Sequence, residues 1–452
     1  MMVNEIDSGP VENSPEPPRP GAGQDAVRRP LGPGWWKAFS LLWAGQALSL
    51  FGSRLAQFAV IWWLTDTTHS ATVLSLATVC TFLPEIFLAP FAGALVDRWN
   101  RKLVMMVSDG LVALAALVLV YLFWSGSVQS WHVFLIIFLR AASGVFQFPA
   151  VQSSTSLMVP DEHLSRVAGL NMALQGAMNI VAPPLAALLL ASLPVYQLVL
   201  MDVITAALAV GILVFVFIPR PSAAPAEGAV TPRSVWNDVR AGLRYALGWP
   251  GLMWILVLAA LINFLFTPAS TLMPLLITDY FKAGAQELGW MESAWSIGML
   301  AGGMLLSVWG GTRRKVVTSM LGLVGMGAGM LLVSAAPANR LWMALAGMAI
   351  GGVMNPITNG PLFALLQSKV APDMQGRVFT LVTSFANAMI PLSMLMAGPL
   401  AEAFGIRFWY WGGAIGCMLL GLAGLCIPAV MHIEEDRPSA ALGGVEAGET
   451  AL

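Results

Sequence analysis

Twelve long apolar runs dominate this sequence and limit the folds that it can adopt. Each is about 20 residues or longer, which is the length of helix that crosses the hydrocarbon core of a bilayer. The runs lie at residues 38–64, 71–95, 103–125, 132–152, 167–191 and 196–218, and at 251–278, 288–309, 315–336, 340–367, 377–402 and 407–431. The strands of a membrane barrel would instead alternate between apolar and polar residues. We therefore predict an all-α integral membrane protein with twelve transmembrane helices in two six-helix halves.

The charged residues support this assignment and orient it. Only 10% of the residues are charged, too few to cover the surface of a soluble protein of this length. With a cytoplasmic N-terminus, the cytoplasmic segments hold 18 of the 23 lysines and arginines and the outer loops hold 3. The other two, Arg54 and Arg140, lie within runs. Because positive charge gathers on the cytoplasmic side, we expect a multi-pass protein of the cell inner (plasma) membrane with both termini cytoplasmic.

Changes of polarity divide the chain into five predicted parts. A Pro- and Gly-rich start and a polar end read as tails, and the central gap carries an amphipathic stretch that would lie on the membrane surface. The parts are a disordered cytoplasmic tail (1–36), an N-terminal bundle (37–219), a cytoplasmic linker with an amphipathic helix (220–250), a C-terminal bundle (251–432) and a second cytoplasmic tail (433–452).

Short motifs recur at matching places in the two halves. Arg166-Val167 recurs as Arg377-Val378, 211 residues later, and Arg101-Lys102 recurs as Arg314-Lys315, 213 residues later. Each pair occupies the same loop of its half, on the same predicted side of the membrane. Parallel six-helix repeats are typical of a large class of secondary transporters.

The sequence GALVDRWNRK, residues 93–102, follows the second run. It resembles the G-x-L-a-D-r-x-g-R-k signature of the major facilitator superfamily, with Asn100 in place of a glycine. The resemblance implies that Asp97 holds a helix N-terminus of the opposite half in one state of the transport cycle. Arg98 and Arg101 would complete the charge network, and Gly93 would allow close helix contact. A solvated turn carrying cytoplasmic charges is the alternative.

Further strings resemble drug exporters of that superfamily. Residues 140–144, RAASG, are similar to the R-x-x-q-G motif of drug:proton antiporters, and 182–187 to a degraded form of their proline-glycine motif. Strings that resemble the macrolide-efflux branch are WAGQALSL (43–50), SATVLS (70–75), FLP (82–84) and GRVF (376–379). The resemblance spans about residues 37–432. It implies export of macrolides and other lipophilic drugs with proton antiport.

Four acidic residues lie inside the runs: Glu85, Asp109, Asp202 and Glu292. We expect the last three to be solvated, since Asp109 lies two turns from the cytoplasmic face and the others lie near the outer face. Glu85 falls near the bilayer centre, where an ionised carboxylate is costly unless it is paired or hydrated. We predict that Glu85 couples transport to protons, with Arg140 as its electrostatic partner and Asp109 as the second candidate. A static buried ion pair is the alternative.

A drug cavity needs aromatic and amphipathic walls, and the 25 methionines would suit an adaptable one. The candidate substrate-binding residues are Phe146, Gln147, Asn179, Asn263, Phe266, Trp295 and Asn387. Helix–helix packing is the alternative role for each.

The predicted function is secondary active export of lipophilic drugs, macrolides or several drug types, in exchange for protons by alternating access. A same-fold exporter of a siderophore or other metabolite is the first alternative, and a non-transporting membrane scaffold or sensor is the second. No phosphate-binding loop, catalytic triad or metal-ligand spacing occurs, so we expect neither an enzyme nor a cofactor or metal. The expected partners are a small lipophilic substrate, protons and the lipid bilayer, without nucleic acid, and the expected form is a monomer.

Overall fold

The computed structural model describes residues 35–216, 240, 243–370 and 372–435, with the backbone alone at residues 90, 93, 94, 97, 98, 372, 373, 376 and 377. Within this part the chain is built from helices, six long ones in each half. Those of the first half are α1 (Trp35–Thr68), α2 (Ala71–Arg98), α3 (Arg101–Trp124), α4 (Ser130–Met158), α5 (Asp161–Leu190) and α6 (Val195–Phe215). The predicted 220–250 linker and both tails lie largely outside the described residues.

The second half repeats this pattern with some interruptions. Its helices are α8 (Pro250–Thr271), α9 (Met273–Leu275), a π-helical turn (Leu276–Tyr280), α10 (Ala285–Trp309), α11 (Lys315–Ala335), α12 (Leu341–Lys369), α13 (Pro372–Phe404), α14 (Arg407–Cys426) and α15 (Pro428–Met431). Eleven helices of the described chain are long and apolar enough to cross a membrane. The twelfth long helix is α10, which is less apolar because it carries Glu292, Ser293 and Ser296. The predicted twelve-helix fold is confirmed.

Local sequence sets where several helices begin and end. The Ser70 hydroxyl caps α2 by accepting a hydrogen bond from the Val73 N–H, and the Asn100 side chain caps α3. Asn100 has a φ of −69°, so it takes the glycine position of the motif as a helix cap and not as a left-handed residue. Gly310 ends α10 in the left-handed conformation, with a φ of 72°. The predicted run 251–278 breaks at Leu272, between α8 and α9.

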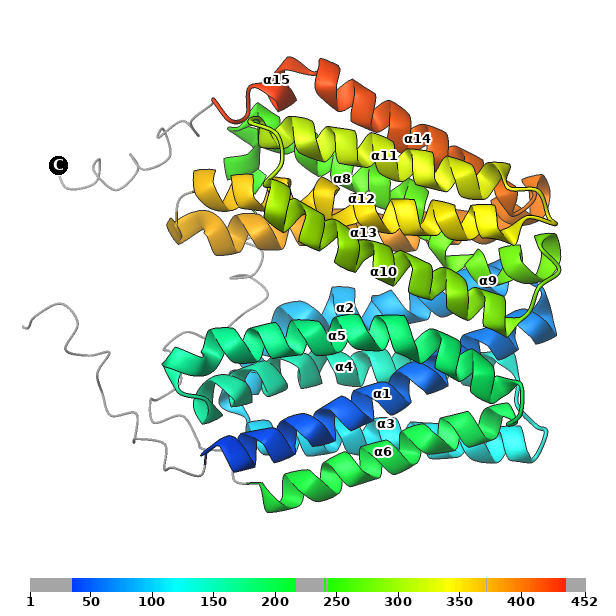
Figure 1. The fold of residues 1–452 in the computed structure, drawn as a ribbon. Helices are drawn as coiled ribbons and strands as arrows, with labels where there is room; N and C mark the ends of the chain where they lie inside the picture. Colours follow the sequence, from blue (N-terminus) through cyan, green and yellow to red (C-terminus); the bar gives the residue numbers. More distant parts are fainter. Residues whose placement is uncertain (1–34, 217–239, 241–242, 371, 436–452) are drawn as a thin grey trace, which may run out of the picture.

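The two halves form separate bundles that pack through α2 against α13 and through α5 against α10 (Figure 1). Among the described residues, several polar contacts join the halves toward one end, which we call the sealed end. Glu402 of α13 accepts hydrogen bonds from Ser70 and Thr72 at the start of α2. His69 contacts Asp279 at 3.0 Å. The Ser293 hydroxyl donates to the carbonyl of Ile180 at 2.7 Å.

Close backbone packing reinforces the sealed end. A Cβ added to Gly398 of α13 would lie 2.5 Å from the Thr72 Cα, and one added to Gly289 of α10 would lie 2.8 Å from the Pro184 Cα. Only glycine allows such an approach without a shift of the backbone. Side chains at these two positions would therefore hold the halves apart.

The opposite end lacks this joint core among the described residues. Its buried apolar clusters each belong to one half: one centres on Trp249 and Leu252 of the second half, and another on Leu42 and Met105 of the first. The cluster that contains residues of both halves lies toward the sealed end, where Leu64 and Leu272 are fully buried. The described halves thus share a core at one end only.

Candidate functional site

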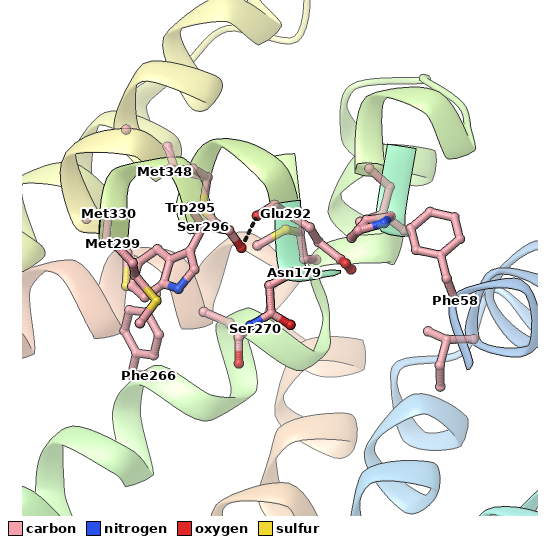
Figure 2. A pocket seen from close by; sticks show the side chains of 18 of the residues that line it. Phe58, Asn179, Phe266, Ser270, Glu292, Trp295, Ser296, Met299, Met330 and Met348 are labelled. Carbon is pink, nitrogen blue, oxygen red and sulfur yellow. Dashed lines mark hydrogen bonds between the residues drawn. The ribbon is translucent and has the colours of Figure 1, made fainter. Parts of the chain in front are cut away.

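A cavity of about 520 Å³ lies between the halves, below the sealed end. Helices α1 and α5 of the first half line one side, and α8, α9, α10, α11, α12 and α14 of the second half line the other. Figure 2 shows several of these side chains around the shared space, including Asn179 from the first half and Phe266 and Trp295 from the second. Because both halves form the walls, any relative movement of the halves changes the cavity.

Most of the wall is soft and apolar. Six methionines line it, Met178, Met273, Met299, Met326, Met330 and Met348, together with the aromatic residues Phe58, Phe266, Trp295 and Tyr410. The rings of Phe266 and Trp295 are 5.4 Å apart and tilted by 39°. Methionine side chains are flexible and polarizable and adapt to ligands of different shape. Such a wall suits a bulky lipophilic molecule.

Four of the polar side chains that interrupt this wall are charged or carry an amide: Arg54 and Gln57 from α1, Asn179 from α5 and Glu292 from α10. Across the described part of the chain, none of the four side chains has a hydrogen bond or an ion pair to the protein. A largely apolar pocket with a few convergent polar groups is the usual form of a small-molecule site. Their free donors and acceptors are thus available to a ligand.

Helix α10 supplies the cavity with one complete face. Leu288, Glu292, Trp295, Ser296 and Met299 line it, a spacing of three and four residues that places side chains in one row. A Cβ added to Gly352 of α12 would lie 2.2 Å from the Trp295 carbonyl oxygen. The close approach of α12 that Gly352 permits therefore supports this face of α10.

The structure brings together three of the seven predicted substrate-binding residues: Asn179, Phe266 and Trp295 all line the cavity. Of the remaining four, Phe146 stacks on Trp99 at the other end of the first half, with ring centroids 6.2 Å apart. Gln147 and Asn263 are engaged in hydrogen bonds within their own halves.

Asn387 lies in α13 and does not line the cavity. Helical periodicity alone does not tell which face of a helix points to the other half of the protein. The arrangement of the helices in space determines which polar or aromatic residues line the cavity.

Asp109 is buried and not solvated as the sequence suggested. Its carboxylate, 3% exposed, accepts hydrogen bonds from Gln46 at 3.1 Å and from Gln147 at 2.5 Å. Gln147 also donates to the side-chain oxygen of Gln46 at 3.2 Å. The three residues come from α3, α1 and α4, so this polar network ties three helices of the first half together.

Arg140 pairs with Asp202 of α6 and not with Glu85. Asp202 is fully buried, contrary to the expectation of a solvated position, and also accepts a hydrogen bond from the Ser53 hydroxyl at 2.7 Å. Burying an ion pair is costly unless hydrogen bonds complete it, and Ser53 provides one. Glu85 is exposed in α2 and has no hydrogen bond or ion pair within the described part of the structure. Asp202 lies 62 residues from Arg140, which is why sequence spacing gave no sign of the pairing.

The signature residues occupy the junction of α2 and α3, at the opposite end from the sealed end. Gly93, Asp97 and Arg98 lie near the end of α2, and their predicted contacts fall outside the description. Arg101 begins α3. The neighbouring Lys102 ammonium donates to the carbonyls of Val214 and Val216 at 2.9 and 3.0 Å, which fixes the end of α6.

Comparison with known proteins gives a consistent picture. The sequence profile described as "Major Facilitator Superfamily" matches residues 42–278 and 264–450. Macrolide efflux protein A of Streptococcus pyogenes is 31% identical over 396 residues, which is 88% of this chain and 95% of that protein. The multidrug efflux pump Tap of Mycobacterium tuberculosis is 25% identical over 405 residues, 88% of this chain and 94% of the pump.

Solved structures share the fold at low identity. A bacterial homologue of the iron transporter ferroportin in an inward-facing state matches with a TM-score of 0.66 and 16% identity, over 88% of this chain and 99% of that one. A bacterial homologue of the human lysosomal transporter Spinster, inward-facing and unoccupied, matches with a TM-score of 0.62 and 12% identity, over 89% and 98%.

Proposed function

This chain belongs to the Major Facilitator Superfamily, and we propose that it exports macrolides or related lipophilic drugs in exchange for protons. Its relatives in sequence are drug efflux proteins over nearly their whole length, so it is a drug efflux transporter rather than an enzyme, placed in the plasma membrane. The finer statements, which concern the substrate, the coupling ion and the orientation, are our proposal.

One observation carries the proposal: a cavity with methionine and aromatic walls lies where the two halves meet and is closed at one end by contacts between them. Alternating access requires a central site that is closed on one side at a time. The charge distribution of the loops supports an outer location for the sealed end. On this basis the structure represents an inward-open state, with the drug site reached from the cytoplasm.

The polar networks of the first half support proton coupling. Asp109 and Asp202 are carboxylates buried at membrane depth, where ionisable residues are expensive and commonly functional. Arg140 belongs to the Asp202 network, so Asp109 and Arg140 are stronger candidates than the exposed Glu85. We propose that protonation of these networks changes the packing of α1 against α3, α4 and α6.

A metabolite exporter is less well supported, because a defined polar substrate requires several paired charges and this cavity presents only Arg54 and Glu292. A static scaffold would not need a cavity whose walls are divided between two separable halves.

Drug accumulation tests the proposal. Expression in a susceptible host should lower the steady-state uptake of a radiolabelled macrolide, and a protonophore should restore it. Gly398→Val should abolish export while retaining the membrane level, since its side chain prevents closure of the sealed end. Gly412→Val in α14 is the matched control, because an added Cβ there meets nothing within 4 Å. Export that is insensitive to the protonophore would refute proton coupling, and export by the Gly398 variant would refute alternating access through this joint.

A further inference from the structure

The cavity contains two opposite charges that come from opposite halves. Arg54 belongs to α1 and Glu292 to α10, and both line the shared space. They form no ion pair with each other in the described chain, so each charge remains available to a ligand in the cavity.

The protein does not satisfy the Glu292 carboxylate. Its neighbours along the helix face are Leu288, Trp295 and Met299, and none of them donates a hydrogen bond to it in the described chain. The nearby Ser296 hydroxyl donates instead to the backbone carbonyl of Glu292, at 3.0 Å, as the dashed line in Figure 2 shows. Because no group of the described protein pairs with this carboxylate, it remains free to accept hydrogen bonds from a ligand in the cavity or to pair with a ligand's cation.

The other acidic residues at membrane depth provide the contrast. Asp202 has Arg140 and Ser53, and Asp109 has Gln46 and Gln147. Those carboxylates are built into the first half by partners of the protein itself. Glu292 faces the cavity without such partners, so its compensation comes from what enters the cavity.

We propose that Glu292 and Arg54 select substrates by charge. Glu292 receives the cationic nitrogen of a lipophilic amine, and the adjoining indole of Trp295 favours the same charge through its ring face. Arg54 donates hydrogen bonds to carbonyl or hydroxyl oxygens elsewhere on the molecule and repels a misplaced cation. The methionines accommodate the apolar body. This inference rests on the proposed export function and specifies the substrate class of the same site.

Two probe ions of nearly equal shape and opposite charge, tetraphenylphosphonium and tetraphenylborate, test it. Their binding to the purified full-length protein is measured by equilibrium dialysis, with protein-free detergent micelles as the blank. The wild type should prefer the phosphonium ion. Glu292→Gln should weaken phosphonium binding by about tenfold or more, as expected for losing a close opposite charge at low dielectric.

Arg54→Gln should strengthen phosphonium binding by about threefold, since it removes a like charge from the wall of the same cavity. The expected changes of opposite sign distinguish charge selection from loss of structure, which would weaken binding in both variants. Glu287→Gln is the matched control, one turn away on α10, because its carboxylate caps the Gly284 N–H at 2.8 Å and does not line the cavity. Its preference should be that of the wild type.

Equal binding of the two ions by the wild type, or equal losses in the Glu292 and Arg54 variants, would overturn the inference. If the Glu292 variant does not fold, the tighter phosphonium binding predicted for Arg54→Gln still tests the inference. Macrolide export by the wild type without charge preference would refute charge selection and leave the proposed function intact. Absence of macrolide export in the wild type would refute the proposed function itself.

Discussion

Removal of the Glu402 carboxylate should open the sealed end. One oxygen of this carboxylate accepts hydrogen bonds from the Ser70 hydroxyl at 3.1 Å, the Thr72 hydroxyl at 2.8 Å and the Thr72 N–H at 3.4 Å. These donors lie at the N-terminus of α2, where negative charge is favoured. Glu402 thus acts as a cap supplied by the opposite half, and Glu402→Ala removes all three bonds without disturbing the helix that carries it.

The expected size follows from the type of contact. A helix cap contributes about 0.5–2 kcal/mol, and the exposure of this carboxylate to solvent places it in the lower part of that range. Ser70 also retains its own capping bond with the Val73 N–H. A loss of about 1 kcal/mol corresponds to a change of about fivefold in the equilibrium between sealed and open states.

Labelling from outside measures this shift. In a background with Cys80, Cys417 and Cys426 replaced, Asn179→Cys places a single thiol on the cavity wall. An impermeant maleimide applied to intact cells should react about fivefold faster when Glu402→Ala is added. Glu435→Ala is the control, because that glutamate pairs with Arg314 of its own half. Equal labelling rates with and without Glu402 would refute the capping argument.

Three other predictions follow from the polar residues and the topology. Asp202→Asn should leave the partly buried Arg140 without its counter-charge and lower both stability and export, by less than the about 3–5 kcal/mol that breaking a fully buried pair costs; fluorescence-detected thermal unfolding measures the stability, and Ser53→Ala should cost less. Glu85→Gln should leave uphill drug export on a pH gradient in liposomes nearly unchanged, and abolished export would return the coupling role to Glu85. Pro225→Cys should resist an impermeant maleimide outside intact cells while Gly284→Cys reacts, and the reverse pattern would invert the proposed orientation.

Apolar length and charge bias were sufficient to predict the fold, because the bilayer enforces both along the chain. The choice of aromatic and amide residues as cavity walls placed Asn179, Phe266 and Trp295 correctly on the cavity, but not the other four candidates. The runs nevertheless underestimate several helices. Helix α4 continues to Met158, beyond the predicted end at residue 152, and α5 starts at Asp161, before the predicted start at 167. The polar ends of these helices extend beyond the hydrocarbon core, so a search for apolar runs does not detect them.

The charged sites were harder to predict, since depth in a span does not reveal partners. The position of Glu85 in its run predicts a place near the bilayer centre, yet its side chain is exposed. Asp202 is predicted to be solvated and is instead fully buried against Arg140. The sequence predicts a solvated Glu292 near the outer face, whereas the structure places it on the wall of the cavity between the halves. No distance along the sequence encodes that interface.

A carboxylate lies at each end of α2, Glu402 of α13 at its start and Asp97 of α2 near its end, and we propose that the two favour opposite states. Glu402 holds the start of α2 to the second half in the state described, and the resemblance of residues 93–102 to the family signature implies that Asp97, near the end of α2, holds the second half in the other state. If both contacts act on one equilibrium, Asp97→Asn should slow labelling of the cavity thiol from outside, opposite to Glu402→Ala. Because the two carboxylates lie at opposite ends of a long helix, their effects should add. The double variant should then label at nearly the wild-type rate while exporting more slowly than it, since both closed states have lost a contact. A double variant that labels as fast as Glu402→Ala alone would show that Asp97 does not bias this equilibrium.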